Sequence, residues 1–363
     1  MMSPAGDPFN VALIQRAAID FYPPTINQAN LLVEAGFRVV VLDGGQGPRP
    51  TALHSDVSLA RPLESAGEGT TGVPKSAARR LLDIVRFLVA ARAIESSTGA
   101  SVLIGYDSPA IAAMAAARFR GFTVCHFHEY PEVPSNEGRK VDAQHRIARR
   151  YARSADLIVM PDRHRAEALE KEDGLTGPSL VVRNCPRRLT QLPAGRLRKA
   201  LDGKRGKYTV LFQGAVSQSY YADRIVESMP WWPSESQLVF LGPVKAACER
   251  SLLGIARDVG MLERVVLLPR VPYSDLFGYT VDADLGLTMA RPHSFNFAHT
   301  AGTSNKRYEF MACGIPQISN HGPGMYELIE ANGVGLCVDP ENPEEIGRRV
   351  AYLLGNETLR RKM

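Results

Sequence analysis

The chain alternates short β-branched apolar runs with amphipathic stretches of helical length, and it does so twice. Runs such as Asn10–Gln15 and Arg38–Asp43 are short and lie between polar or turn residues, which is typical of buried strands. Stretches such as Ile26–Ala35 separate them with helical spacing. This β-α-β alternation favours parallel sheets with helices on both faces. We therefore expect an α/β protein built from two doubly wound, Rossmann-like domains.

The pattern is interrupted once, which sets the expected domain boundaries. Cys185–Lys207 is rich in Pro, Arg, Leu and Gly and shows no sustained period. We expect a first domain over 1–190, a linker over 191–207 and a second domain over 208–363. Ligands of such sheets bind at the carboxyl ends of the strands, so a cleft between the domains is the predicted site. Further strands are predicted at Ser101–Gly105, Thr123–Phe127, Asp156–Met160, Ser179–Arg183, Tyr208–Gln213, Gln237–Gly242, Val265–Pro269, Asp284–Met289, Pro316–Ser319 and Gly335–Val338.

Composition excludes several classes of protein. Among 363 residues, 45% are hydrophobic and 22% are charged, the balance of a globular protein rather than a disordered one. No stretch approaches the ~20 apolar residues of a membrane-spanning helix, and Met1 to Ala12 lack the parts of a signal peptide. Five cysteines without a CxxC pair fit a reducing compartment. We therefore expect a cytoplasmic protein.

The net charge of +5 is distributed unevenly. Residues 1–200 contain 26 basic and 20 acidic residues, whereas 201–363 contain 17 and 18. A basic half suits an anionic substrate, an anionic membrane face or nucleic acid, but an ordinary Arg-rich composition is the favoured interpretation. The arginines of the predicted helix Glu137–Arg153 have the same two interpretations, a solvated face or peripheral membrane contact, and this helix lacks a strong opposing apolar face. We expect no nucleic-acid partner.

The segment His299–Gly314 has the highest density of candidate site residues. Thr303 or Ser304 is suited to cap the helix that follows, whose free N–H groups suit a phosphate. Lys306 in the first turn adds a positive charge, and Glu309 can accept two hydrogen bonds from a ribose diol. The alternative is a capped core helix with an exposed lysine and glutamate.

Two glycine turns add candidate anion sites in the second half. Gly214 directly follows a predicted strand, where glycine lets the backbone approach a ligand closely. Gly322 and Gly324 flank Pro323 before another predicted helix. The alternative for both is a simple turn.

The first half offers a histidine pair. His126 and His128 end a predicted strand and share a face because side chains alternate along a strand. They suit a metal site with nearby carboxylates, a substrate site that includes Glu129, or a structural role; we expect no metal, because a third ligand is missing. Asp107, after the strand before, belongs to the cleft or caps the helix from Pro109. Asp282 and Asp284 are interpreted as boundary residues.

Motifs of other enzyme classes are absent from the sequence. No GxSxG element of a serine hydrolase and no GxxxxGK[ST] loop occurs. No GxGxxG follows the first predicted strand, which argues against a nicotinamide dehydrogenase.

Longer stretches resemble the retaining glycosyltransferases of GT-B fold, family 4. The stretches are LFQGAVS, QLVFLGP, RVVLLPRVPYSDLFGYTVDADLGL, SNKRYEFMACGIPQISN and GPGMYELIEANGVGLCVDPENPEEI, and the looser ADLIVMPDRHRAEAL, VVRNCP and HEYPE in the first half. The resemblance implies a bacterial-like, metal-independent hexosyltransferase without a resident cofactor. Its donor, a nucleoside-diphosphate sugar, binds the second domain, and its acceptor, a glycan, glycolipid or small natural product, binds the first.

The resemblance also implies roles for individual residues. Glu309 falls at the ribose-binding glutamate, and Ser304, Asn305 and Lys306 fall near the donor phosphates, with Gly214 at the diphosphate turn. His128 falls at the histidine near the transferred sugar, so His128, Lys306 and Glu309 are the expected catalytic residues. The expected donor-binding residues are Gly214, Ser217, Arg224, Ser304, Asn305, Lys306, Glu309, Gly322 and Gly324. The expected acceptor-side residues are Asp107, His126, His128 and Glu129.

Two departures from the family pattern bear on the expected donor site. The E-x7-E motif would need an acid at Ala301, and the basic pair after the glycine turn is missing, with Arg224 the first cation. Losing a charge-assisted phosphate contact is serious unless Lys306, Arg291 or Arg224 replaces it. Two alternatives to a transferase therefore stay open: a degenerate GT-B protein that acts as a non-catalytic partner, and a sugar-nucleotide epimerase of related fold.

Overall fold

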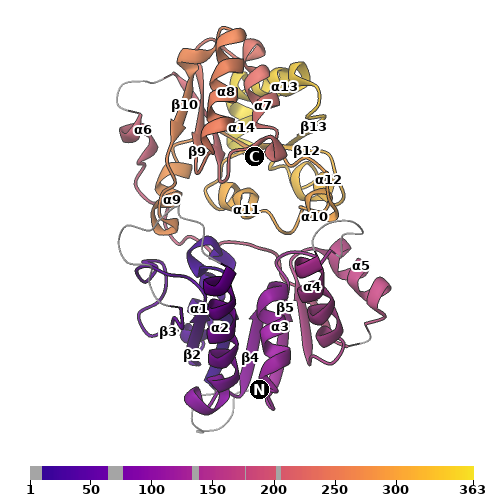
Figure 1. Cartoon of the computed structure of the whole chain (residues 1–363). Helices are drawn as coiled ribbons and strands as arrows, with labels where there is room; N and C mark the ends of the chain where they lie inside the picture. The colour runs from indigo at the N-terminus through magenta and orange to yellow at the C-terminus, as the bar shows by residue number, and fades with distance from the viewer. Residues whose placement is uncertain (1–9, 64–76, 133–138, 176, 202–205) are drawn as a thin grey trace. The chain divides into compact units, whose positions relative to one another are not determined.

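The computed structural model of the chain divides into two compact units, Met1–Arg183 and Asn184–Met363. The structure describes residues 10–63, 77–132, 139–175, 177–201 and 206–363 (Figure 1). Each unit is an α/β domain with its own sheet, as the alternation predicted. Among the described residues, no helix is both long enough and apolar enough to cross a bilayer.

The sheet of the first unit is parallel throughout its described part, with strand order β3-β2-β1-β4-β5-β6-β7. Val11 and Leu13 of β1 pack on the α1 side of the sheet, whereas Ala12 and Ile14 pack on the side of α2 and α3. This period of two makes every central strand apolar on both faces. The strands are β1 (Asn10–Gln15), β2 (Arg38–Asp43), β3 (Ser58–Ala60), β4 (Val102–Tyr106), β5 (Phe122–His126), β6 (Leu157–Met160) and β7 (Ser179–Val181), and the helices are α1 (Pro23–Glu34), α2 (Ala77–Thr98), α3 (Asp107–Ala117), α4 (Arg139–Ala152) and α5 (Arg163–Asp173).

The second unit contains a parallel sheet of order β10-β9-β8-β11-β12-β13 within the described residues. Val210 and Phe212 of β8 pack in a core with α7, α8 and α13, and Leu211 faces the opposite core with α9 and α11. The strands are β8 (Tyr208–Gln213), β9 (Ser236–Leu241), β10 (Val265–Leu268), β11 (Leu285–Thr288), β12 (Gln317–Asn320) and β13 (Gly335–Val338), and the helices are α6 (Leu197–Ala200), α7 (Ala222–Glu227), α8 (Ala246–Asp258), α9 (Tyr273–Thr280), α10 (Phe295–Ala298), α11 (Asn305–Ala312), α12 (Met325–Ile329), α13 (Pro343–Gly355) and α14 (Glu357–Lys362).

The segment 191–207, expected as a linker, lies in the second unit in its described part. It contains the one-turn helix α6, and Leu197 and Leu201 are buried in the core beside α9. Two leucines four residues apart share one helix face. A single turn is too short to show a period in the sequence, which is why the segment reads as irregular.

Candidate active site

Lys306 lies in the first turn of α11 with its Nζ buried between two aromatic rings. The Nζ is 4.1 Å from the ring centre of Phe212 and 4.3 Å from that of Tyr220. Within the described part of the chain it has no hydrogen-bond partner. Burial and the charge of neighbouring Arg307 lower the pKa of Lys306 to about 7, although Glu309 acts against both. This ammonium group is therefore placed to gain from an incoming anion.

Gly214, the residue after β8, lies against Lys306. Its φ of +105° is a conformation that L side chains rarely adopt, and a Cβ there would stand 3.5 Å from the Cε and Nζ of Lys306. Its N–H donates to the carbonyl of Leu241 at 2.9 Å. On the neighbouring strand end, Gly242 has a φ of +152°, and a Cβ on it would lie 2.1 Å from the Gly214 carbonyl oxygen. The Lys306 side chain thus lies at van der Waals distance from one side of Gly214, and Gly242 packs directly against the Gly214 carbonyl.

Glu309 is buried one turn further along α11. Its Oε2 accepts a hydrogen bond of 2.6 Å from Nε2 of Gln213, the last residue of β8. The Gln213 Oε1 in turn accepts from the Thr280 hydroxyl at 2.9 Å, which fixes the direction of the amide. Burial raises the pKa of Glu309 to about 7, and the Gln213 hydrogen bond and Lys306 reduce that rise. A carboxyl group in this position is preorganised to accept hydrogen bonds from a ligand.

The start of α11 differs in one respect from the expected cap. Ser304 occupies the N-cap position, but its side chain makes no capping hydrogen bond, so the predicted capping interaction is wrong. Beside it, the Oδ1 of Asn305 is buried without a hydrogen-bond partner among the described residues. The Ser304 side chain therefore satisfies none of the first N–H groups of this eight-residue helix, although its carbonyl accepts from the N–H of Arg307 at 3.2 Å.

Arg307 holds the segment before α11 in place. Its guanidinium is buried and donates to the carbonyls of Thr288 at 3.0 Å and Thr300 at 2.6 Å. The hydroxyl of Tyr308 donates to the carbonyl of Ala301 at 2.8 Å, and Ala301 itself is buried. The chain at 301 is thus positioned through its backbone, and no acidic side chain is needed for that purpose.

The two arginines considered as replacement cations are already engaged. Arg224 contacts Glu227 at 2.6 Å and Glu341 at 3.5 Å. Arg291, which follows β11, lies 3.5 Å from Asp223 and 4.0 Å from Glu341. Arg224 donates a hydrogen bond to Glu227, whereas the Nε and Nη2 of Arg291, like the Nζ of Lys306, have no hydrogen-bond partner among the described residues.

The turn after β8 carries strain at Tyr221. Ser217 precedes a 3-10 turn, Gln218–Tyr220, and Tyr221 then adopts a φ of +57° before α7. The Arg291 guanidinium lies over the Tyr221 ring at 4.4 Å, and the backbone N–H of Arg291 donates to the carbonyl of Ser219 at 2.8 Å. Left-handed backbone at a non-glycine residue is often found at functional sites.

The second glycine turn opens α12. Gly324 has a φ of +70° and precedes this five-residue helix, as the sequence indicated for its position. Gly322 lies after β12, at the same carboxyl edge of the sheet as Gly214 after β8. Asp282 and Asp284 are boundary residues as expected, since they bind the backbone N–H groups of Arg198 and Thr209.

In the first unit, the histidine pair lies at the corresponding carboxyl edge. The Nδ1 of His128 is 3.2 Å from the Oδ2 of Asp107, and the Asp107 Oδ1 accepts from the backbone N–H groups of His128 and Glu129. Burial opposes ionisation of Asp107, but the charge of His128 and these hydrogen bonds outweigh it and lower the pKa of Asp107. Asp107 has a φ of +58° and does not cap α3. The aspartate instead orients the histidine.

His126 is the buried second member of the pair. Its ring centre is 4.9 Å from that of His128, which confirms that the two share a face. Its Nδ1 lies 3.1 Å from the Gln28 Oε1, which also accepts from the Tyr106 hydroxyl at 2.8 Å. Burial and the His128 charge lower the pKa of His126 to about 3, so it is neutral under ordinary conditions.

The Nε2 atoms of His126 and His128 are both buried without a hydrogen-bond partner in the described residues. Glu129 is exposed, with Arg165 3.8 Å away, and the buried Arg165 donates to the carbonyl of His128 at 2.9 Å. Among residues described by the structure, no three His, Cys, Asp or Glu side chains converge as metal ligands would.

Sequence reasoning missed the residues that support these groups. Gln213, Tyr220 and Gln28 each contact an expected site residue but carried no assigned role. The one available signal was a polar residue at the end of a buried apolar strand, as at Gln213, because a buried amide needs partners.

Comparison with known proteins bears on the fold of the chain and on the family of its second half. Residues 195–363 match the sequence profile of the family glycosyl transferases group 1. Sucrose-phosphate synthase from Thermosynechococcus elongatus superposes with a TM-score of 0.71 at 15% identity, covering 97% of this chain and 91% of that one. HepE of Anabaena, in complex with UDP and glucose, superposes with a TM-score of 0.71 at 15% identity, covering 97% of this chain and 92% of that one. WaaG, a glycosyltransferase of lipopolysaccharide biosynthesis, superposes with a TM-score of 0.65 at 16% identity, covering 97% of this chain and 92% of that one.

Other matches are less informative. A putative UDP-N-acetylglucosamine 2-epimerase from Listeria monocytogenes gives a TM-score of 0.58 at 13% identity over 98% and 90% of the two chains. Among curated proteins, none matches at a significant level. At these identities the structural matches show the fold alone.

The two Rossmann-like units thus define a protein of GT-B fold. Residues 195–363, just under half of the chain, match the family glycosyl transferases group 1, and this match supports glycosyltransferase activity.

Proposed function

We propose that the chain transfers a hexosyl group from a nucleoside-diphosphate sugar to an acceptor hydroxyl, with retention of anomeric configuration. The observation that carries this proposal is the convergence of Lys306, Gly214 and Glu309 at the carboxyl edge of the second sheet. The buried ammonium group of Lys306 beside the glycine turn at Gly214 suits a diphosphate, and the buried carboxyl group of Glu309 suits a ribose diol.

The proposed chemistry is electrostatic rather than nucleophilic. The bond from the sugar C1 to the diphosphate oxygen breaks, and the acceptor oxygen bonds to C1 on the same face. The acceptor proton passes to the departing diphosphate, whose growing negative charge Lys306 and the N–H groups at the start of α11 stabilise. Because Lys306 supplies this cation, we propose that no resident metal or other cofactor takes part.

On the acceptor side we propose His128, oriented by Asp107, as the main contact. The Asp107 carboxylate holds the proton on Nδ1, which leaves the lone pair of Nε2 free for a substrate hydroxyl. His126 and Glu129 complete this proposed acceptor site, with His126 neutral and packed against His128.

The donor proposal is tested by thermal unfolding with UDP, GDP, dTDP and ADP. A nucleotide at 100 times its Kd stabilises the protein by ~2.7 kcal/mol. Each kcal/mol raises the thermal midpoint by roughly 2–4 °C. We expect one nucleotide, with UDP the first to try because it is bound in HepE, to raise the midpoint of the wild type but not of Glu309→Ala. Glu263→Ala is the matched control, since Glu263 is exposed and precedes β10, at the amino edge of the sheet.

The stereochemical proposal has its own measurement. Proton NMR of the anomeric centre in the first product formed should show the configuration of the donor sugar. An inverted product would overturn retention while leaving transfer itself intact.

One observation favours the second candidate, a non-catalytic partner. The Arg224 side chain is hydrogen-bonded to Glu227 at 2.6 Å and Arg291 lies 3.5 Å from Asp223, so a phosphate would compete with a carboxylate for each of these candidate cations. If no nucleotide of the panel stabilises the wild type, this candidate replaces the transferase.

A further inference from the structure

Among the described residues, three of the four polar groups of His128 have a partner. The backbone N–H donates to the Asp107 Oδ1 at 2.8 Å, and the ring Nδ1 lies 3.2 Å from the Asp107 Oδ2. The carbonyl accepts a hydrogen bond of 2.9 Å from the Nη1 of Arg165. The ring Nε2 is the group left without a partner. His128 is therefore fixed at three points, and its fourth polar group is the one that a ligand can use.

Arg165 holds the His128 carbonyl from the first turn of α5. The residue is buried, with an exposed fraction of 1%, and its backbone N–H donates to Asp162, the residue that caps this helix, at 3.3 Å. The carboxylate of Glu129 lies 3.8 Å from the same Nη1. Burying a guanidinium group costs free energy even when the group is paired. A buried arginine that binds this carbonyl therefore indicates that the position of the carbonyl matters.

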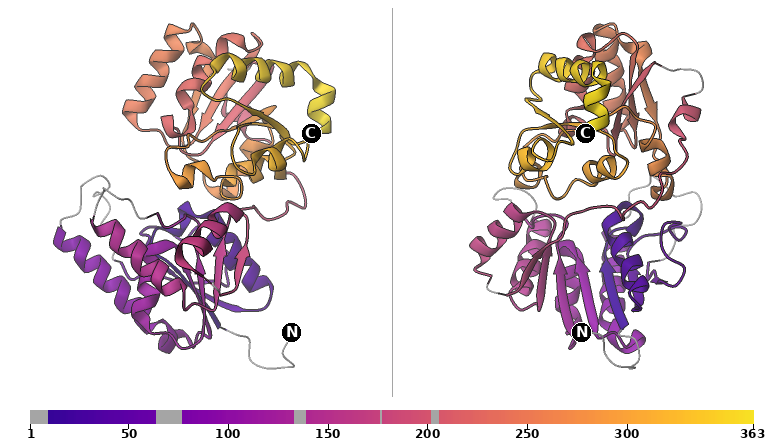
Figure 2. Two further views of the ribbon diagram at one scale, coloured as in Figure 1. Left: turned by 90° about the vertical axis from the view of Figure 1, so that its right-hand side faces the viewer. Right: turned by 180° about the vertical axis from the view of Figure 1, so that it is seen from behind.

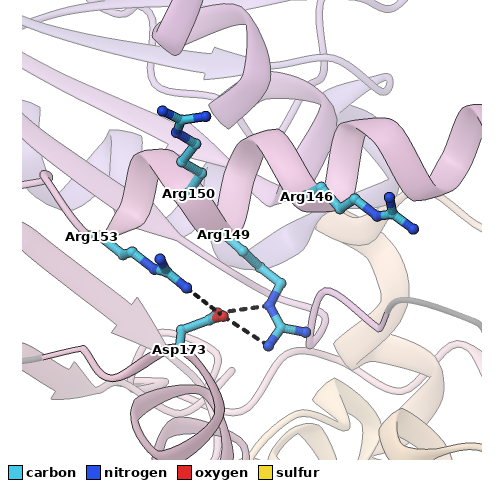
Figure 3. A pocket seen from close by; sticks show the side chains of 5 residues that line it. All are labelled: Arg146, Arg149, Arg150, Arg153 and Asp173. Atoms are coloured by element: carbon cyan, nitrogen blue, oxygen red, sulfur yellow. Dashed lines mark hydrogen bonds and ion pairs between the residues drawn. The ribbon is translucent and has the colours of Figure 1, made fainter.

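The loop after β5 is tied to α5 a second time, at Tyr130. The Tyr130 hydroxyl donates to the Oε2 of Glu172 at 2.5 Å, and Arg149 of α4 donates to the same oxygen at 3.0 Å. The helices α4 and α5 lie next to one another in the first unit (Figures 1 and 2). Figure 3 shows the Arg149 side chain turned toward Asp173 of α5, which it contacts at 2.7 Å. Two contacts with α5, one on either side of Glu129, thus restrain the loop.

We propose that Arg165 is a positioning residue for the acceptor site, which keeps the His128 ring in contact with Asp107 and its Nε2 directed at the acceptor hydroxyl. Asp107 binds the N–H and the ring of His128 through one carboxylate, so the histidine could still turn about that side chain. The hydrogen bond from Arg165 to the carbonyl removes this freedom. A displacement of about 1 Å at a reacting group can lower a rate by about 100-fold. The inference rests on the acceptor role proposed above for His128.

Arg165 contributes both a hydrogen-bond donor and a charge. Burial lowers the pKa of Arg165, and the carboxylates of Glu129, Asp162 and Asp107 act against this effect. Lysine would supply a donor and a charge at a single point, whereas methionine would supply neither. Comparison of the two substitutions therefore separates these contributions from the volume of the side chain.

The test is NMR of the full chain labelled with ¹⁵N in its eight histidine rings. The hydrogen bond of a histidine ring decides which nitrogen carries the proton, and a proton held between Nδ1 and a buried carboxylate exchanges slowly with water. We expect a slowly exchanging Nδ1 proton in the wild type, assigned to His128 by its absence from His128→Gln. Arg165→Met should abolish this signal, whereas Arg165→Lys should keep it with faster exchange.

Arg163→Met is the matched control, since Arg163 lies in the same turn of α5, its side chain is 74% exposed, and it pairs with Glu167 at 3.3 Å. It should leave the His128 signal unchanged. A folded Arg165→Met protein with the wild-type signal overturns the proposal. So does a wild type without the signal, because Arg165 would then have no contact to maintain. If Arg165→Met does not fold, Arg165→Lys decides: exchange at the wild-type rate overturns the proposal, and faster exchange supports it.

This result is separate from the test of the proposed donor site, which lies in the second unit. The nucleotide-induced thermal shift should be the same in Arg165→Met and in the wild type. If no nucleotide stabilises the wild type, the transferase proposal fails, yet the NMR comparison still shows whether Arg165 positions His128. In a transfer assay, Arg165→Met should lower kcat by about 100-fold and leave the KM of the donor unchanged, and an unchanged kcat would contradict the positioning role.

Discussion

The Glu309 carboxylate accepts a hydrogen bond of 2.6 Å from the Gln213 amide, joining α11 to the last residue of β8. Gln213 cannot reverse its amide freely, because its oxygen already accepts from Thr280. The carboxyl group is thus held in one orientation by a strand end and is deprived of water. Both the position and the protonation of Glu309 follow from this relationship.

The raised pKa of Glu309 predicts a pH-dependent contribution to stability. A group whose pKa rises on folding stabilises the protein fully at pH values below its pKa in the unfolded state. For Glu309 this contribution is lost as the pH rises through its folded-state pKa of about 7. Relative to Glu309→Gln, the wild type should lose stability between about pH 4.5 and 7, by at most about 3 kcal/mol. Thermal midpoints of the two proteins across this range measure the difference, and parallel pH profiles would contradict the prediction.

The lowered pKa of Lys306 predicts proton uptake when a nucleoside diphosphate binds. At pH 8 a lysine with a pKa of about 7 is mostly neutral, and a diphosphate beside it restores its charge. Calorimetric titration in buffers of different ionisation enthalpy should therefore show protons taken up by the wild type and by Lys362→Met, but not by Lys306→Met. Equal uptake in all three proteins would show that another group carries the proton.

Asp107 offers a test of the proposed acceptor side. Asn tolerates the left-handed backbone at this position, so Asp107→Asn should keep the fold. Without the carboxylate, the proton of His128 is no longer held on Nδ1. We expect the transfer rate to fall by about 100-fold or more, with the nucleotide-induced thermal shift unchanged. An active Asp107→Asn enzyme would mean that the His128 tautomer has no part in the reaction.

The buried hydrogen bonds of Gln28 predict a cost in stability. Gln28→Leu removes the acceptor of both the Tyr106 hydroxyl and the His126 ring. Leaving buried polar groups without partners should cost about 1–3 kcal/mol each, measured by urea denaturation. In a Tyr106→Phe background the same substitution should cost less, because one of the two unsatisfied groups is gone. Additive effects would contradict the shared acceptor.

The fold was predictable because apolar periodicity is a local property of the sequence. Four predicted strands match the observed ones residue for residue: Asn10–Gln15 is β1, Arg38–Asp43 is β2, Tyr208–Gln213 is β8 and Gly335–Val338 is β13. The three-residue edge strand β3 and the short helices α10 and α14 were not predicted, since elements of this length show too few turns or alternations.

The site was predictable only in part. Glycine after a strand and a lysine in a helix first turn are visible in sequence, and the structure brings Gly214 and Lys306 together. The Gln213–Glu309 contact spans 96 positions, and the Gln28–His126 contact spans 98. Pairings over such distances depend on strand order, which periodicity does not specify.

The contact between Gly242 and Gly214 has a consequence for how this chain can change. A Cβ at 242 would lie 2.1 Å from the Gly214 carbonyl oxygen, so the turn at Gly214 packs directly against the backbone of Gly242. A saturation library at position 242 should return glycine alone when selected for nucleotide binding, although no ligand needs to reach that residue. Because the clash is with backbone atoms that every residue at 214 would present, no substitution at 214 can relieve it.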